Sequence, residues 1–428
     1  MYGSAKKNIF KMLDLIHHQG LRIALGAFRT SPVQSLYAEA GEPSLKHRRQ
    51  KLSMNYFLKL KSLPENPCFD SVFNASPPEF FEKSKSDPAF GARTLPHIQN
   101  SEINYKKIDD SHVRTPPPWE ESRIFFDTSL NNLKKDETNE VIYRKEFCRI
   151  REGYSGSYEA FTDGSKQDQR VGAAAFYPKN PDESDAVRLR DGSSIYNAEL
   201  EGILLALNKF KTLKRLHSHF TIHTDSLSAV EGLRNRNFVN KNVRRIFNLI
   251  RDFPSRVHIS IVWIPAHVGI SGNETVDKLA KAALMRAVSI GKLLCWSDLK
   301  CQVNTYISSV WQESWDGEVR NKLHEVLPKL NESLSTDGTN RKNETVLCRL
   351  RIGHTWITHS YLLKKEDQPF CHGCDSFFTV KHFLVECSDF HDTRIRFYNV
   401  TDMYRLFREV RPSKVLNFVK EIGIYGKI

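Results

Sequence analysis

The sequence predicts a mixed α/β domain in the middle of the chain, with helical segments before and after it. Between residues 157 and 287, short runs rich in β-branched and aromatic residues alternate with longer runs whose apolar residues recur at helical spacing. The flanking parts show only helical spacing, except that nine of the 18 prolines fall between residues 64 and 118. The pattern predicts four segments: a basic helical segment at 1–63, a proline-rich and mostly irregular linker with some local strand or helix at 64–156, the α/β domain at 157–287 and a helical tail at 288–428.

The α/β domain is expected to contain five strands and four helices. The strands are expected at residues 158–162, 171–177, 186–189, 220–224 and 258–264, and the helices at 197–210, 226–233, 241–251 and 272–287. A turn is expected at Gly164 after the first strand, and Pro265 is expected to end the last one. This order predicts a mixed five-stranded sheet with helices packed against it.

The chain carries an excess of positive charge. It has 63 Lys and Arg against 50 Asp and Glu, a net charge of +13, and its first 60 residues hold ten basic and three acidic side chains. Such a balance favours a polyanionic partner, either nucleic acid or an anionic membrane, although solvated surface charge is the alternative interpretation. The N-terminal helices, expected at 8–28, after Pro32 and after Pro43, would present part of this charge.

Hydropathy and cysteine content limit the cellular compartments in which the protein is expected. The sequence has no run of about 18 apolar residues that would span a bilayer, and Lys6, Lys7 and Lys11 do not suit a signal peptide. We therefore expect an intracellular protein that is not secreted, in the nucleus or the cytoplasm, with no membrane partner. Eight cysteines in 428 residues are too few for a disulfide scaffold, so the scattered ones are expected to be free thiols.

Four acidic residues stand where an open α/β sheet builds its sites, at strand ends and helix starts. They are Asp163, Glu199, Asp225 and Asp277. Each alone is compatible with a helix cap, a turn or a solvated side chain. Converging carboxylates would repel one another, so together they are expected to bind divalent cations, and hard oxygen ligands select Mg²⁺ or Mn²⁺. His267 follows the last expected strand, in a glycine-rich loop that can bend towards the same site.

Four stretches of sequence carry these residues and resemble the type 1 ribonuclease H domain. They are FTDGS at 161–165, NAELEGI at 197–203, HTDSLSA at 223–229 and IPAHVGISGNETVDKLA at 264–280. The last stretch is the most specific, and the resemblance covers residues 157–287. It implies a ribonuclease H-like sheet flanked by helices, and an endoribonuclease that hydrolyses the RNA strand of RNA–DNA hybrids with two Mg²⁺ or Mn²⁺ ions.

The resemblance also implies a role for each residue of the site. Asp163 would bridge both ions, while Glu199 and Asp225 would complete the ion on the leaving-group side. Asp277 would hold the ion that activates water, and His267 would assist proton transfer or product release. None of the five residues is substituted relative to the family pattern, which favours catalysis.

Nucleic-acid contacts are expected from polar and basic residues around this site. Ser165 and Asn197 are candidates for contacts with phosphate or 2′-hydroxyl groups. A basic cluster that follows Asp225 is expected to bind the phosphate backbone. It consists of Arg234, Arg236, Lys241, Arg244, Arg245 and Arg251, and a second cluster comprises Lys209, Lys211, Lys214 and Arg215. Simple solvation of these helix charges is the alternative.

A cysteine–histidine cluster lies in the tail, which gives the tail a zinc-knuckle-like character. Its members are Cys371, Cys374, His382 and Cys387. Their spacing, Cys-x2-Cys-x7-His-x4-Cys, suits a tetrahedral Zn²⁺ site. His372 and His391 are rival ligands, and four free groups in a helical domain are the alternative interpretation.

The wider order of segments resembles the C-terminal part of non-LTR retrotransposon polyproteins of the LINE-like, Jockey type. The stretches that carry this resemblance are LRIALGAFRTSP at 21–32, EPSL at 42–45 and CRLRIGH at 348–354. A reverse transcriptase active site needs Tyr or Phe, one residue and two aspartates, and Asp109-Asp110 lack that spacing. We expect a piece of a larger polyprotein that does not polymerise. Its expected partners are RNA–DNA hybrids, nucleic acid generally and a separate reverse transcriptase.

Two other functions stay open at this point. A non-catalytic nucleic-acid-binding remnant would hold nucleic acid through its basic helices and its tail, and the lack of a polymerase site favours it. A structure-specific DNA nuclease would place acids on a similar sheet, but the stretch at 264–280 argues against that function.

Overall fold

The computed structural model describes residues 5–74, 88–133, 137–289, 293–335, 338 and 340–428. The chain forms two compact units, Met1–Ser53 together with Asn304–Ile428, and Met54–Val303. The division falls inside α3 (Leu45–Lys61) and inside α12 (Lys300–Asp316). The two units cut across the four segments that the sequence predicts. Residues 75–87 and 134–136 of the expected linker lie outside the described residues.

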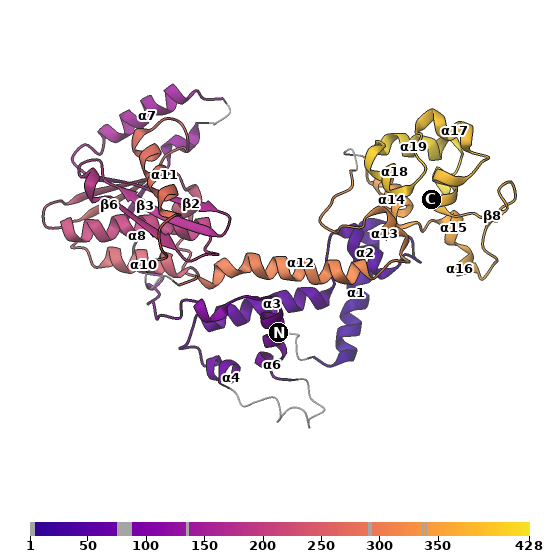
Figure 1. The fold of residues 1–428 in the computed structure, drawn as a ribbon, viewed down its shortest axis with the longest axis horizontal. Coiled ribbons are helices and arrows are strands. Elements are labelled where there is room, and N and C mark those ends of the chain that lie inside the picture. The colour runs from indigo at the N-terminus through magenta and orange to yellow at the C-terminus, as the bar shows by residue number, and fades with distance from the viewer. Residues whose placement is uncertain (1–4, 75–87, 134–136, 290–292, 336–337, 339) are drawn as a thin grey trace. The chain divides into compact units, whose positions relative to one another are not determined.

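A six-stranded sheet lies at the centre of the unit Met54–Val303 (Figure 1). Its strands are β1 (Ile124–Asp127), β2 (Tyr158–Gln167), β3 (Arg170–Phe176), β4 (Asp185–Leu189), β5 (His219–Thr224) and β6 (His258–Trp263). Their order is β1-β6-β5-β2-β3-β4. The first four strands in this order run parallel, and the last two pair antiparallel with their neighbours. The predicted mixed α/β fold is confirmed, with six strands in place of the predicted five.

The additional strand, β1, comes from the segment that the sequence predicts as linker. It pairs in parallel with β6, with Ile124 opposite Ile259. Just before the strand, Arg123 donates a hydrogen bond to the carbonyl oxygen of Phe253 at 2.8 Å. The sheet edge formed by β6 is therefore covered by chain that precedes the predicted domain.

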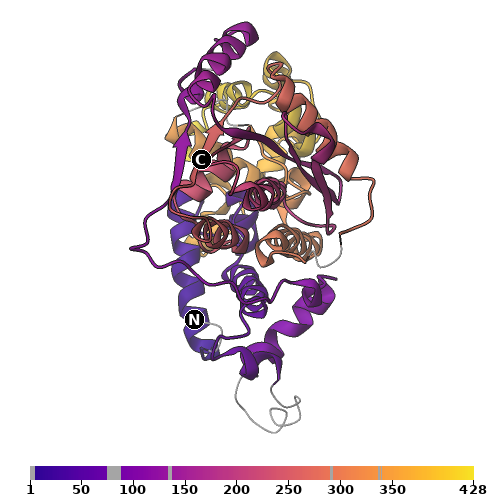
Figure 2. The same ribbon diagram turned by 90° about the vertical axis from the view of Figure 1, so that its left-hand side faces the viewer.

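Helices cover both faces of this sheet. On one face lie α8 (Ile195–Leu213), α9 (Leu227–Arg234) and α10 (Lys241–Arg251), and on the other lie α7 (Glu140–Glu152) and α11 (Ser271–Ala283). Successive residues of a strand point to opposite faces. Accordingly, Ala160 of β2 joins the core under α8, whereas Phe161 joins the core under α7 and α11. Helices α8 and α10 run side by side in Figure 1, and Figure 2 shows them nearly end-on.

Gly164 lies inside β2 and does not form the turn that the sequence predicts. The strand continues beyond it, and the chain reverses at Asp168, whose φ angle is +54°. A Cβ atom at Gly164 would lie 2.8 Å from the Cβ atom of Ala198 and 2.8 Å from the backbone nitrogen of Glu199. The glycine therefore allows α8 to approach β2 closely, which brings Glu199 beside Asp163.

The remaining elements of this unit are short. They are α4 (Phe69–Phe73), α6 (Phe90–Asn100), η2 (Tyr105–Lys107), η3 (Ser129–Asn132), η4 (Pro181–Glu183) and η5 (Trp296–Leu299). Of the helices in the described ranges of the whole chain, none combines the length and the apolar composition that crossing a membrane requires.

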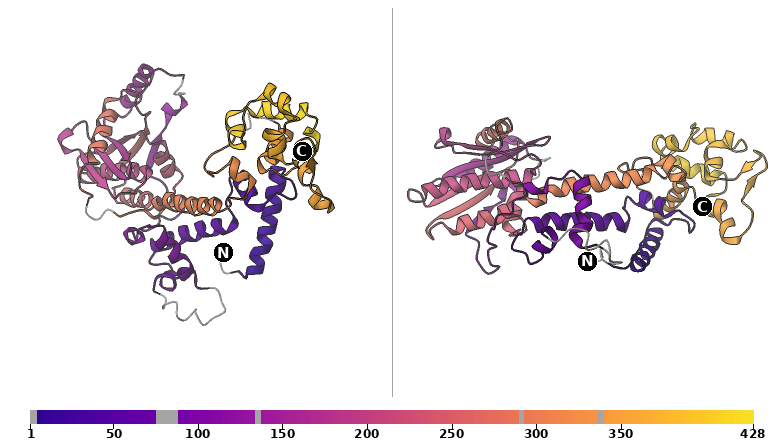
Figure 3. Two further views of the ribbon diagram at one scale, coloured as in Figure 1. Left: turned by 45° about the vertical axis from the view of Figure 1, so that its right-hand side comes forward. Right: turned by 60° about the horizontal axis from the view of Figure 1, so that its bottom comes forward.

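The other unit is helical and joins both ends of the chain. Its elements are α1 (Lys7–Leu25), α2 (Val33–Ala40), α13 (Lys322–Val326), α14 (Arg341–Ile352), α15 (Trp356–His359), α16 (Tyr361–Lys364), β7 (Phe370–Cys371), β8 (Ser376–Phe377), the π-helical turn η6 (His382–Glu386), α17 (His391–Phe397), α18 (Met403–Glu409), α19 (Pro412–Glu421) and η7 (Tyr425–Lys427). Leu21 and Leu36 share one core with Leu347 and Phe418. Figure 3 shows α1 and α2, in indigo, beside the C-terminal helices, in yellow. Helices α1 and α2 thus complete the core of the tail.

Candidate active site

Three acidic side chains meet at one end of the sheet, towards the carboxyl ends of its two central parallel strands. Asp163 lies on β2, Asp225 directly follows β5, and Glu199 lies on α8. Because β2 and β5 run parallel, both strands carry their acids towards the same end of the sheet. One carboxylate oxygen from each residue lies within 4.8 Å of the others. These three residues are called the acidic triad below.

The acidic triad is largely removed from solvent. Asp163 and Glu199 are each 7% exposed. Burial, followed by the charges of Asp225 and Asp277, raises the pKa of Asp163 to about 7. Burial also raises the pKa of Glu199 well above its ordinary value, and the two aspartates of the triad raise it further. The folded chain therefore disfavours three bare negative charges at this place, and a bound cation would relieve that repulsion.

The donor atoms of the triad suit such a cation. Oε2 of Glu199 is buried and has no hydrogen-bond partner among the described residues. An unpaired buried carboxylate oxygen is costly in a folded protein. Mg²⁺ and Mn²⁺ take oxygen ligands of this kind. The carboxylate oxygens of the triad therefore suit the divalent cations that the sequence predicts.

The other two predicted catalytic residues lie around the triad. Asp277, on α11, accepts a hydrogen bond from Nζ of Lys281 at 2.7 Å, and its charge contributes to the raised pKa of Asp163. His267 is exposed on the loop between β6 and α11, where its φ angle is +57°. It is close enough to Asp225 to oppose the rise in the pKa of that carboxyl. The structure thus groups three of the five residues tightly and places two nearby.

Two side chains that the sequence pattern did not indicate hold Asp225 in position. Nδ2 of Asn273 donates to Oδ2 of Asp225 at 3.0 Å, and Nε1 of Trp263 donates to its backbone carbonyl at 3.0 Å. Asn273 lies four residues before Asp277 on α11. Side chains at this spacing share one face of a helix. The spacing from Asp277 could therefore have identified Asn273 as a residue that faces the site.

The raised pKa of Asp163 predicts how stability depends on pH in metal-free buffer. The folded chain keeps a proton on Asp163 up to about pH 7, whereas the unfolded chain releases it near 3.8. The folded state therefore binds more protons in this window. The free energy of unfolding should fall as the pH rises from about 4 to about 7, by up to about 4 kcal/mol. Urea unfolding in EDTA at a series of pH values measures this fall.

Asp163→Asn is the control for this measurement. It removes the titrating group and should remove the corresponding part of the pH dependence. The difference between the two proteins separates Asp163 from buried His223, whose pKa burial lowers to about 4 and whose titration acts in the opposite direction. Identical pH profiles for the wild type and the variant would contradict the prediction.

The sequence around this site matches a known family. Residues 155–285 match the family model described as RNase H. The chain contains an RNase H domain. The matched residues include the acidic triad, His267 and Asp277, whereas β1 and α7 precede them.

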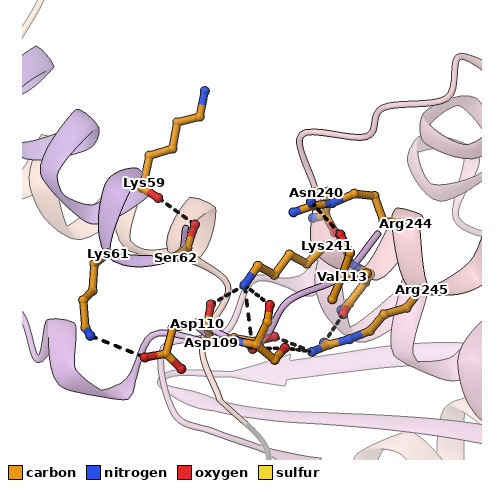
Figure 4. A network of polar contacts seen from close by, with 12 residues as sticks. Lys59, Lys61, Ser62, Asp109, Asp110, Val113, Asn240, Lys241, Arg244 and Arg245 are labelled. Carbon is orange, nitrogen blue, oxygen red and sulfur yellow. Dashed lines mark hydrogen bonds and ion pairs between the residues drawn. The ribbon is translucent and has the colours of Figure 1, made fainter. Parts of the chain in front are cut away.

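The basic residues of α10 bind the segment of chain that precedes β1 (Figure 4). Nζ of Lys241, only 3% exposed, donates to the carbonyl oxygens of Asp109 and Ser111 at 2.7 Å each. Arg244 and Arg245 donate to the same segment. Lys241 and Arg244 are thus engaged within this unit, and their predicted nucleic-acid contacts stay predictions. Buried cations must satisfy their donors locally, and here backbone carbonyl oxygens do so.

Asn197 and Arg236 also have partners inside this unit. Asn197, 2% exposed, donates to the carboxylate of Asp298 at 2.5 Å and accepts from Nδ2 of Asn240 at 2.7 Å. Arg236 donates to the carbonyl oxygen of Pro118 at 2.9 Å. These bonds hold the preceding segment and the start of α10 in place, and the predicted nucleic-acid contacts of Asn197 and Arg236 stay predictions.

The other three predicted nucleic-acid contacts also stay predictions. Ser165 is 9% exposed and stands two residues after Asp163, so both side chains lie on one face of β2. Arg234 is exposed and pairs with Glu231 at 2.6 Å. The guanidinium of Arg245 is partly exposed beside its bond to Asp109.

The predicted cysteine–histidine cluster is assembled in the helical unit. Its four members, Cys371, Cys374, His382 and Cys387, each offer a ligand atom that lies within 4.8 Å of the other three. Nε2 of His382 is buried and unpartnered among the described residues. Three cysteine sulfurs and one imidazole are a ligand set that Zn²⁺ takes in closed tetrahedral sites. The rival ligands His372 and His391 lie outside this group.

Proposed function

We propose that this chain is an endoribonuclease that hydrolyses the RNA strand of RNA–DNA hybrids. The RNase H domain supports ribonuclease activity on hybrids in general. The acidic triad, with three converging carboxylates of which those of Asp163 and Glu199 are buried and that of Asp225 is half-buried, is the observation that carries the proposal. Two divalent cations, when bound, would supply an activated water and stabilise the leaving oxygen of the phosphodiester.

Each residue of the site would have a separate role in the reaction. Asp163, Glu199 and Asp225 would hold the cations, since their burial and mutual repulsion favour cation binding over three separate charges. Asp277, beside the triad, would add a ligand on the side of the attacking water. His267, exposed at the rim, would carry a proton between the site and solvent.

Recognition of RNA would use one side chain of the sheet and two side chains of the neighbouring helices α9 and α10. Ser165 lies on the face of β2 that carries Asp163 and would contact a phosphate or a 2′-hydroxyl group. Arg234 and Arg245, which keep exposed guanidinium surface, would contact the backbone.

Cleavage of labelled substrates tests the proposed activity. The wild-type chain is incubated in Mg²⁺ with an RNA–DNA hybrid, double-stranded DNA and single-stranded RNA. We expect cleavage of the RNA in the hybrid alone, and none in EDTA. Cleavage of double-stranded DNA would favour a DNA nuclease. A folded chain that binds the hybrid without cleaving it would favour the non-catalytic nucleic-acid-binding function.

We also propose that the cysteine–histidine cluster binds one Zn²⁺ ion that stabilises the helical unit. The convergence of four suitable ligand atoms and the unpartnered Nε2 of His382 support this proposal.

A non-LTR retrotransposon origin is the third proposal, with a separate reverse transcriptase as the partner that supplies hybrids. The order of a basic helical segment, an RNase H domain and a Cys/His cluster supports it. Co-elution with a non-LTR reverse transcriptase in size-exclusion chromatography is expected, and independent elution would count against the partnership.

A further inference from the structure

Helix α7 lies outside the residues that match the RNase H family, yet it packs directly beneath the candidate active site. Tyr143 and Phe147 of this helix are buried in the core that also contains Phe161 of β2 and Val268 of the loop after β6. The ring centroid of Phe147 lies 5.3 Å from that of His223 on β5. Phe161 and His223 each stand two residues before an aspartate of the acidic triad. The helix is therefore held against the strands and the loop that build the site.

One cation of α7, Arg144, lies against the loop that carries His267. A Cβ atom at Gly269 would lie 3.0 Å from Nη1 of Arg144 and 3.7 Å from its Cζ atom. Gly269 follows His267 by two residues, and His267 is near enough to Asp225 to act on its pKa. The guanidinium of Arg144 thus stands at the rim of the site, on its histidine side.

The guanidinium of Arg144 is free to bind a ligand. The side chain is exposed, and within the described ranges it makes neither a hydrogen bond nor an ion pair. Other arginines of the same helix are paired, Arg149 with Glu146 at 2.9 Å and Arg151 with Glu159 at 2.6 Å. A guanidinium presents a planar set of donors that matches the oxygens of a phosphate.

We propose that Arg144 binds a phosphate of the hybrid next to the cleavage site, an inference that rests on the proposed function. The acidic triad repels the phosphates of an approaching strand. A guanidinium at the rim, carried by a helix that is packed against the site, would offset this repulsion and orient the backbone. Because α7 precedes residues 155–285, this contact would be an addition that the matched domain alone does not contain.

Arg144→Gln tests the proposal, with Arg149→Gln on the same helix as the matched control. The Kd for a blunt RNA–DNA hybrid is measured in EDTA over a range of salt concentrations, and kcat and KM are measured in Mg²⁺. We expect Arg144→Gln to raise both Kd and KM by about tenfold at low salt. The slope of log Kd against log salt should become shallower by about 0.9. Arg149→Gln should leave both quantities unchanged, and Arg144→Lys should retain most of the salt slope.

The outcomes separate this inference from the proposed function. If the wild type cleaves the hybrid and Arg144→Gln keeps the wild-type salt slope, the inference about Arg144 is overturned and the proposed function stands. A weaker affinity with an unchanged slope would indicate a purely structural role and would also overturn it. If the wild type does not cleave, the proposed function fails, and the binding measured in EDTA still decides whether Arg144 contacts the backbone.

Discussion

Replacement of Asp225 by asparagine is expected to lower kcat for hybrid cleavage by roughly a thousandfold. Asparagine keeps the shape of the side chain, and its amide oxygen can still accept the hydrogen bond that Nδ2 of Asn273 donates at 3.0 Å. The local structure should therefore persist. The change removes one of three carboxylates whose oxygens lie within 4.8 Å of one another, and with it a charge that, in the proposed function, would help to hold a cation. Hybrid binding in EDTA, followed by fluorescence anisotropy, should not weaken.

Asp127→Asn is the matched control for this variant. Asp127 also ends a strand at this end of the sheet, since β1 runs parallel to β6 and β6 to β5. Its carboxylate accepts from the backbone nitrogen of Ser129 at 2.9 Å and from the hydroxyl of Tyr154 at 3.2 Å, away from the triad. We expect its kcat to stay near the wild-type value. An Asp225→Asn variant that keeps more than about a tenth of the wild-type kcat would contradict a metal-binding role for Asp225.

The carboxylates are the part of the site that the sequence predicts best. The carboxyl ends of neighbouring parallel strands lie at the same end of a sheet, so the strand pattern alone brings Asp163 and Asp225 together. Gly164 shows the limit of this reasoning. An Asp-Gly pair is a turn signal, and the pattern does not reveal that a helix on the sheet occupies the space of the missing Cβ atom.

Prediction from the sequence is least specific in the chain before the matched domain, where it expects some local strand or helix without locating either. β1 has only four residues, and its partner β6 comes far later in the chain, so no local pattern identifies their pairing. Helix α7 has a local signal, because the side chain of Asn139 caps it by accepting from the backbone nitrogen of Val141 at 2.9 Å. The predicted linker nevertheless extends over this helix, although its prolines end at residue 118. β1 completes the sheet, and α7 packs against a strand and the loop that build the site.

The positive charge of a side chain does not reveal whether that side chain binds a nucleic acid or another part of the same chain. The basic side chains after Asp225 predict phosphate contacts, yet Lys241 and Arg236 bind backbone carbonyl oxygens of the chain before β1. Arg144 shows the reverse case, since it stands in the expected linker and its guanidinium is free at the rim of the site. Only the tertiary fold decides which cations remain available for a ligand.

Removal of zinc from the cysteine–histidine cluster is expected to unfold the surrounding part of the helical unit. The strands β7 and β8 have two residues each, too few to form a stable hairpin alone. The sulfur of Cys387 lies 3.6 Å from that of Cys374 and 4.0 Å from that of Cys371, and such thiol contacts are weak without a metal. Structural Zn²⁺ contributes on the order of 10 kcal/mol of folding free energy in small zinc domains, so its loss should have a large effect here.

Cys387→Ala tests this expectation against two controls. The variant should bind no zinc and should lower the Tm of the helical unit by at least about 20 °C, as measured by metal analysis and thermal unfolding. Cys148→Ala removes an exposed thiol on α7, and His372→Asn removes an exposed imidazole beside Cys371 that lies outside the ligand group. Both controls should retain one zinc ion per chain. Full zinc content in Cys387→Ala would exclude Cys387 as a ligand, and zinc loss from His372→Asn would show that this histidine takes the place expected for His382.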